Sequence, residues 1–140
     1  MASDLRAAGI ACKWQASPCG PLTWLDAANS LHVLRIFQEA IGNVLVHSKA
    51  SEIRIGCHEL DRNRVAGIAS YVADNGIGLD IAAGLSGKGL ANMRARARAL
   101  HGVLDCEPQA GGGTIVTLWL PYSRSGPLPA EGLLDQYSQN

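Results

Sequence analysis

The chain has 140 residues, the length of one domain, and it is long enough to bury a hydrophobic core. Hydrophobic residues make up 47% of it and charged residues 17%, a composition that fits a globular protein better than a disordered one. Twelve basic side chains balance twelve acidic ones, so the net charge gives no reason to expect binding to nucleic acid or to an anionic membrane. The apolar stretches are shorter than the roughly 18 residues of a membrane helix, and the amino terminus shows no export signal.

The four cysteines are isolated from one another in the sequence. They form no CxxC pair and no spacing typical of metal ligands: Cys12, Cys19, Cys57 and Cys106. Reduced thiols are therefore favoured over a disulfide or a metal site, and reduced thiols suit a cytoplasmic protein.

The first elements in chain order are a short strand and a long helix. Residues 10–15 alternate between apolar and polar side chains, which indicates a strand, and Pro18 and Pro21 then break the chain. A helix is predicted to begin near Asp26, with Thr23 as a candidate cap, and to run for about six turns. Its apolar positions recur every three or four residues, and we expect them to form the core face: Leu31, Leu34, Phe37, Ile41, Val44 and Leu45.

Two strands and a small-residue segment follow. Residues 53–57 alternate with period two and predict a strand, 61–64 form a polar hairpin loop, and 65–73 return as a second strand. Residues 79–86 are rich in small side chains and show no clear period, so we interpret them as a mobile lid.

The last part of the chain predicts a second helix and a closing pair of strands. Gly87-Lys88-Gly89 opens the helix, which ends near His101. Its apolar face consists of Leu90, Met93, Ala97 and Leu100. Three further side chains are expected to be solvated, because alternate positions do not share a helix face: Arg94, Arg96 and Arg98. Residues 103–107 and 114–120 form strands joined by a glycine turn at 111–113.

This order of elements predicts an α/β fold, a two-layer α/β sandwich with a mixed, largely antiparallel sheet. The domain is expected to span residues 1–121, and the polar residues 122–140 to form a flexible tail. A doubly wound dinucleotide fold is disfavoured, because the glycine-rich segment does not follow a strand directly and no Walker-type motif occurs.

Polar side chains recur along one ridge of the first helix. Glu39, Asn43 and His47 are spaced four residues apart and span roughly 12 Å of one helix face. Carboxylate and amide oxygens suit Mg²⁺, which makes Asn43 a candidate magnesium ligand. Glu39 would orient a metal-bound water or accept a proton from a nucleophile. From the spacing alone, a solvated polar face is the simpler explanation.

An acidic loop follows the strand at 65–73 directly. Asp74 ends this apolar run, and Gly76 and Gly78 leave room for a planar ligand to approach the backbone. A fixed carboxylate beside such glycines is suited to reading a nucleobase, so we interpret Asp74 as an adenine-binding residue. On its own the motif is also a good turn sequence that needs no ligand.

Two glycine-rich segments are candidates for contact with the rest of a nucleotide. Gly87-Lys88-Gly89 stands at a helix start, where free N–H groups and the helix dipole favour phosphates. A plain hinge before an ordinary helix is the alternative. Thr114 follows three glycines and would place a hydroxyl against the adenine pocket, although a glycine hairpin needs no ligand.

Taken in order, four segments resemble the GHKL ATPase domain of sensor histidine kinases, which has the Bergerat fold. They read QEAIGNVLVHS at 38–48, DNGIG at 74–78, GKGLANMRARA at 87–97 and GGT at 112–114. The resemblance covers residues 31–121, and four ordered motifs are more specific than any one of them. A short lid followed by a GxGLxxMRxRA-type helix resembles the branch of kinases that signals to NarL-type response regulators.

The resemblance implies roles for individual residues in binding ATP with Mg²⁺. Glu39 corresponds to the catalytic base or polarising group, Asn43 to the magnesium ligand and Asp74 to the adenine-binding aspartate. The other cofactor-binding positions implied are His47 and Lys88 near the phosphates, Gly76 and Gly78 in the base pocket, Gly87, Gly89 and Leu90 at the lid hinge, and Thr114 beside the base.

The reaction implied is transfer of the γ-phosphoryl group of ATP to a histidine, followed by relay to an aspartate of a NarL-type response regulator. The partners implied are ATP or ADP, a histidine-bearing dimerisation domain of the same kinase, and the regulator. The location implied is the cytoplasm, as part of a membrane-bound sensor.

Two departures from the family pattern matter. Val46 stands where relatives often carry a basic residue near the phosphates, so His47 and Lys88 would have to supply that charge. None of the four histidines lies in the acceptor pattern of the family, a histidine followed by an acidic residue on a dimerising helix: His32, His47, His58 and His101. The chain is therefore expected to bind nucleotide but to lack a histidine to phosphorylate.

Two other functions compete with the kinase. The same pocket would serve a nucleotide-gated protein-binding module of the anti-sigma-factor type. A degenerate scaffold that has lost its nucleotide is disfavoured, because Glu39, Asn43 and Asp74 are all present.

Overall fold

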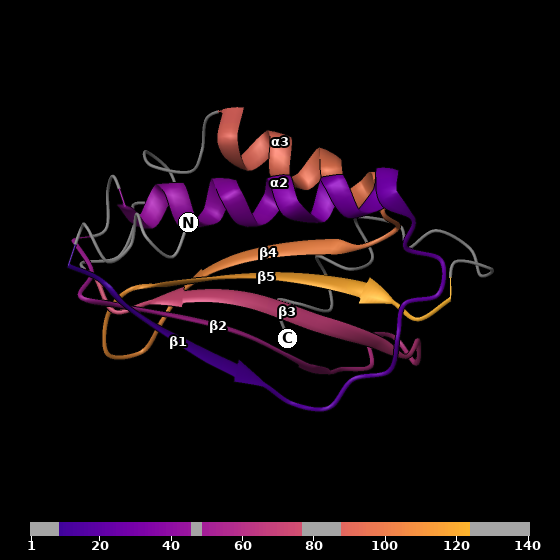
Figure 1. Ribbon diagram of the computed structural model, residues 1–140, viewed down its shortest axis with the longest axis horizontal. Helices are drawn as coiled ribbons and strands as arrows, with labels where there is room; N and C mark the ends of the chain where they lie inside the picture. The colour runs from indigo at the N-terminus through magenta and orange to yellow at the C-terminus, as the bar shows by residue number, and fades with distance from the viewer. Residues whose placement is uncertain (1–8, 46–48, 77–87, 124–140) are drawn as a thin grey trace.

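The computed structural model describes residues 9–45, 49–76 and 88–123 of the chain. Within this part, five strands form one sheet and two helices lie side by side over one of its faces (Figure 1). The elements are β1 (Ala11–Ala16), α2 (Ala27–Asn43), β2 (Glu52–Glu59), β3 (Gly67–Asp74), α3 (Lys88–Ala99), β4 (Val103–Pro108) and β5 (Thr114–Pro121). The predicted two-layer α/β sandwich is confirmed.

The sheet has the strand order β1-β2-β3-β5-β4. Strands β1 and β2 run parallel, with Ala11 opposite Glu52, and every other pair is antiparallel. The sheet is thus mixed and largely antiparallel, as predicted. The segment predicted as a strand at 65–73 begins two residues later, because Val65 forms an isolated bridge with Arg62 instead.

The face that α2 turns toward the sheet differs from the predicted one. Ile36, Ala40 and Val44 are buried, whereas Leu31 and Leu34 are 49% and 50% exposed. The prediction that both leucines belong to the core face was wrong. Leu31 precedes Ala40 by about two and a half helical turns, so the two side chains lie on opposite sides of the helix. The sheet covers one side and leaves the leucines outside.

The start of α2 also differs from the prediction. The helix cap is Asp26, whose Oδ1 accepts a 2.8 Å hydrogen bond from the backbone N of Asn29, and not Thr23. A carboxylate at this position satisfies an N–H group that has no partner within the helix. The α-helical part has 17 residues and ends at Asn43, and Val44 and Leu45 continue it as a π-helical turn. Residues 46–48, which would complete the predicted six turns, lie outside the described residues.

The predicted apolar face of α3 is confirmed, since Leu90, Met93, Ala97 and Leu100 are all buried. The helix ends as expected near His101, whose φ of 58° lies in the left-handed region. The backbone N of Gly102 then donates a 2.8 Å hydrogen bond to the carbonyl of Ala97. This arrangement closes the last turn of the helix.

The other face of the sheet is covered in part by the connection between β2 and β3. Trp119 is 1% exposed, and its indole Nε1 donates a 2.7 Å hydrogen bond to the carbonyl of Leu60. Arg62 pairs with Asp105 at 2.8 Å across the same region. Gly67 lies under the Trp119 ring, where an added Cβ would overlap the indole.

The residues after β5 are anchored to the connection between β1 and α2. The Tyr122 hydroxyl accepts a 3.0 Å hydrogen bond from the backbone N of Gly20 and donates one of 2.7 Å to Glu59. Trp24 Nε1 donates to the carbonyl of Pro121 at 2.8 Å. Tyr122 is therefore part of the folded unit, and the rest of the predicted tail, 124–140, lies outside the described residues.

Candidate functional site

The ends of two helices and two strands meet at one end of the molecule. The last turn of α2, the first turn of α3, the end of β3 and the start of β5 all lie on the left in Figure 1. The helices are antiparallel, so the C-terminus of one lies beside the N-terminus of the other. Most of the predicted site residues stand on these four ends.

Asp74 is a buried carboxylate at the end of β3, with 3% of its surface exposed. Its Oδ1 accepts a 2.8 Å hydrogen bond from the backbone N of Gly76. Asn75 Oδ1 accepts hydrogen bonds from the backbone N atoms of Ser51 and Glu52, at 3.0 and 2.9 Å, and fixes the loop to the start of β2. The segment is therefore a turn, and the turn directs its carboxylate inward.

The glycine turn before β5 packs directly against Asp74. At Gly113, where φ is +91°, an added Cβ would overlap the carbonyl oxygen of Asp74. Gln109 Nε2 donates to that carbonyl at 3.1 Å and to the carbonyl of Thr114 at 3.5 Å. Thr114 is 2% exposed. The structure thus brings the predicted base-supporting threonine close to the predicted adenine-binding aspartate.

Glu39 lies against the first turn of α3. A Cβ at Gly89 would lie 2.5 Å from Glu39 Oε1, so the absence of a side chain at 89 makes room for the carboxylate. The glutamate is exposed to solvent. Leu90 is 7% exposed and packs in the core, where it holds this end of α3 in place.

Asn43 is the last residue of α2. Its Nδ2 atom is buried and has no hydrogen-bond partner in the described part of the chain. Rotation of the amide by 180° about χ2 exchanges its two ends and would direct the oxygen to that unpaired position. An unpaired buried amide is costly unless a ligand completes it, so the residue fits the role of a Mg²⁺ ligand.

Some predicted positions lie outside the described residues. These are His47, Gly78 and Gly87, together with the lid at 79–86 and the side chain of Lys88, whose backbone begins α3. Among the residues that are described, no group of three or more His, Cys, Asp or Glu side chains could hold a metal ion. None of the described helices is long and apolar enough to cross a membrane.

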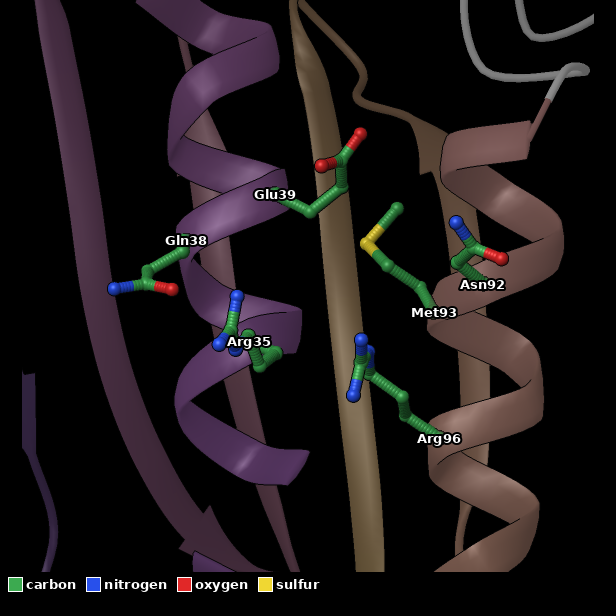
Figure 2. A pocket seen from close by; sticks show the side chains of 6 residues that line it. All are labelled: Arg35, Gln38, Glu39, Asn92, Met93 and Arg96. Carbon is green, nitrogen blue, oxygen red and sulfur yellow. The ribbon is translucent and has the colours of Figure 1, made fainter. Parts of the chain in front are cut away.

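A groove of about 200 Å³ runs between α2 and α3 and was not predicted (Figure 2). Its lining is Arg35, Gln38, Glu39, Asn92, Met93 and Arg96. Arg96, which was expected to be solvated, is half-buried, and its side chain points toward α2. It follows Met93 by three residues, so the two lie on one side of the helix. That three-residue spacing is the sequence signal that would have placed Arg96 beside the buried Met93.

All four cysteines are free thiols in this structure. Cys106 stands on β4, and burial raises the pKa of its thiol to about 11. Because the thiolate is the reactive form, Cys106 is not a candidate nucleophile at neutral pH.

Comparisons with known proteins show the family and the fold of the chain. A family model described as Histidine kinase-, DNA gyrase B-, and HSP90-like ATPase matches residues 28–124. The chain is 39% identical over 100 residues to the nitrate/nitrite sensor protein NarQ of Escherichia coli K12. That match covers 70% of this chain and 17% of NarQ, so the chain spans about one sixth of that relative's length.

Solved structures with this fold include histidine kinase AdeS of Acinetobacter baumannii, with a TM-score of 0.66 and 18% identity, over 88% of this chain and 59% of that one. Another is full-length ShkA in complex with AMPPNP, with a TM-score of 0.68 and 20% identity, over 92% of this chain and 29% of that one. These similarities support the same fold. The family match covers more than half of the chain, and the chain therefore belongs to the family of histidine kinase-, DNA gyrase B- and HSP90-like ATPases.

Proposed function

We propose that this chain is the ATP-binding catalytic domain of a two-component sensor histidine kinase. The observation that carries the proposal is the buried carboxylate of Asp74, against which the backbone of Gly113 is packed. Carboxylates are seldom buried unless hydrogen bonds or a ligand complete them. The family match and the likeness to a sensor protein favour a kinase over an anti-sigma-factor type of module.

Asp74 would select the base. The exocyclic amine of adenine donates hydrogen bonds, and a carboxylate only accepts them. Guanine presents a carbonyl oxygen at the same position and would meet the carboxylate with an unfavourable pair of acceptors. Thr114 and the glycine turn would support the base from the side of β5.

The phosphates would lie at the first turn of α3, where Gly89 allows close approach and the N–H groups favour negative charge. Asn43 would hold Mg²⁺ through its amide oxygen, since its amide is buried and unpaired in the described part of the chain. When bound, Mg²⁺ neutralises part of the phosphate charge. Glu39 would accept the proton of the acceptor imidazole as the phosphoryl group is transferred.

The acceptor histidine would belong to a dimerisation domain outside this chain, and the phosphoryl group would pass on to an aspartate of a NarL-type response regulator. The chain spans 17% of its sensor relative, which leaves room in such a protein for these parts. We place the domain in the cytoplasm, as part of a membrane-bound sensor.

Calorimetry tests the proposal. ATP and ADP should bind in the presence of Mg²⁺ and more weakly with EDTA, and GTP should bind at least about tenfold more weakly, because one charged hydrogen bond contributes roughly 1.5–3 kcal/mol. Absence of binding for both adenine nucleotides at millimolar concentration would refute it. Transfer of labelled γ-phosphate to a separately purified histidine-bearing domain distinguishes a kinase from a nucleotide-gated module.

A further inference from the structure

Two arginines line the groove between α2 and α3. Arg35 comes from α2 and Arg96 from α3. In Figure 2 the guanidinium group of Arg96 lies between the helices, and that of Arg35 lies over α2. Neither takes part in an ion pair within the described residues, where the ion pairs are Lys13 with Glu52 and Arg62 with Asp105.

The only carboxylate that lines the groove does not neutralise these charges. Glu39 Oε1 points toward Gly89 at the other end, away from both guanidinium groups in Figure 2. Arg96 Nη1 lies 3.4 Å from His32 Nδ1, and because a guanidinium only donates, the imidazole nitrogen is the acceptor. This bond leaves the positive charge of Arg96 without a carboxylate in the described part of the chain. Two guanidinium groups that line one groove and form no ion pair there are suited to a carboxylate or a phosphate.

The arginine pair lies beyond Glu39 when viewed from the proposed nucleotide end. Arg35 precedes Asn43 by eight residues, or roughly 12 Å along the helix. The order along α2 is therefore the proposed metal ligand Asn43, the proposed proton acceptor Glu39 and then Arg35, of which the last two line the groove. A molecule held by the arginines would approach Glu39 from the side opposite to the nucleotide.

The neighbouring surface of α2 identifies the kind of molecule. Leu31 and Leu34 are 49% and 50% exposed on the helix turn that also carries Arg35. Exposed leucines next to a positive groove complement an apolar and acidic surface, whereas the phosphate tail of a nucleotide has no apolar part.

We propose that Arg35 and Arg96 bind a carboxylate of an amphipathic acidic helix, and that Leu31 and Leu34 cover the apolar side of the same helix. This inference rests on the proposed function for its biological partner, the helix of the phosphoacceptor domain. The groove would position that helix so that its histidine reaches Glu39. Arg35 and Arg96 are thus positioning residues.

The test uses a synthetic helical peptide of about 18 residues, roughly 27 Å long, with leucines on one face and glutamates beside them. A twin peptide carries glutamine in place of glutamate. Amide NMR of the nucleotide-free chain should show shifts confined to α2 and α3. Arg35→Gln and Arg96→Gln should each lower the affinity for the glutamate peptide up to about fivefold, as expected for exposed charge pairs. The double variant should abolish the preference for glutamate.

Arg94→Gln is the matched control, because this exposed arginine of α3 loses the same charge outside the groove and should leave peptide affinity unchanged. Equal binding of the two peptides, shifts elsewhere, or no binding at millimolar concentration would each overturn the inference. A parallel titration with ADP separates the alternatives. Loss of ADP affinity in the double variant would show that the groove binds the phosphates of the nucleotide and would overturn the inference. A wild-type chain that binds the peptide but no nucleotide would refute the proposed kinase function and leave the peptide inference standing.

A different observation concerns two thiols at the end of the molecule opposite to the proposed nucleotide site. Cys19 Sγ lies 3.8 Å from Cys57 Sγ, although 38 positions separate them in the chain. The backbone N of Ser17 donates a 2.9 Å hydrogen bond to the carbonyl of Cys57, and Gly20 is held by Tyr122. The backbone on both sides of Cys19 is thus anchored, which keeps the two sulfur atoms together.

We infer that Cys19 and Cys57 form a disulfide when a peroxide is present. With hydrogen peroxide, one thiolate attacks a peroxide oxygen and breaks the O–O bond, which gives a sulfenic acid and a hydroxide ion that takes a proton from solvent to become water. The second thiol then attacks the sulfenic sulfur, forms the S–S bond and releases the sulfenic oxygen as a second water. The two thiols lose two electrons in total, and the peroxide accepts them.

Peptide mapping under non-reducing conditions after treatment with hydrogen peroxide tests this. We expect a Cys19–Cys57 linked peptide and a higher Tm for the oxidised chain, because the bond closes a long loop that contains α2. Cys57→Ser should abolish the linkage, and Cys12→Ser should retain it. Intermolecular disulfides, other pairings, or oxidation of either thiol to sulfinic acid alone would overturn the inference.

Discussion

Replacement of Asp74 by asparagine separates nucleotide binding from folding. The side chain is 3% exposed and accepts a 2.8 Å hydrogen bond from Gly76 N. Asparagine has nearly the same shape, and its Oδ1 can accept the same bond. The free energy of unfolding should therefore change by less than about 1 kcal/mol, the value of one ordinary hydrogen bond.

The effect on adenine nucleotides should be much larger. The amide nitrogen of asparagine is a donor, so it would face the exocyclic amine of adenine, which is also a donor. Loss of a hydrogen bond to a charged group corresponds to roughly 1.5–3 kcal/mol, or about 10- to 150-fold in Kd. Calorimetry with ADP and Mg²⁺ measures this change directly, and thermal unfolding of the same sample measures stability.

Asp105→Asn provides the matched control. It makes the same chemical change on β4, where the carboxylate pairs with Arg62 at 2.8 Å away from the proposed nucleotide site. ADP affinity should stay at the wild-type value in this variant. An Asp74→Asn chain that binds ADP as tightly as the wild type and melts at the same temperature would show that Asp74 does not read the base.

Three further changes test other parts of the structure. Asn43→Ala should remove most of the Mg²⁺ dependence of ATP binding, and a Mg²⁺ titration identical to that of the wild type would contradict its role. Gly113→Ala should lower stability by about 1–3 kcal/mol, since alanine is strained at φ +91° and its Cβ overlaps the carbonyl of Asp74; an unchanged Tm would be inconsistent with this contact. Asp26→Ala should lower stability by about 1 kcal/mol through loss of the hydrogen bond from Asn29 N, measured by urea unfolding, and the cap is unimportant if the midpoint does not move.

The sequence predicted α3 more accurately than α2 for a physical reason. In α3, Leu90, Met93 and Leu100 share a single apolar face, and the structure buries that face. In α2, apolar residues stand on opposite sides, and Leu31 and Ala40 cannot both face the sheet. Periodicity alone does not say which side the sheet covers.

The individual site residues were found by local patterns, but their environments depend on the assembled sheet. Asp74 stands out as a carboxylate after an apolar strand, and the turn it forms follows from Asn75 and Gly76. The contact between Gly113 and Asp74 arises from the pairing of β3 with β5, whose order no local pattern contains. The groove that Arg35 and Arg96 line is likewise absent from any local pattern, because it depends on how closely α2 and α3 pack.

The position of β1 at one edge of the sheet has a practical consequence. The family match begins at residue 28, whereas Ala11–Ala16 already pair in parallel with β2. A fragment trimmed to the family boundary would leave bare the backbone N–H and C=O groups of β2 that bond to β1 between Glu52 and Cys57. Bare strand edges recruit strands of other molecules, so such a fragment would be prone to precipitate, and expression clones should start upstream of Gly9.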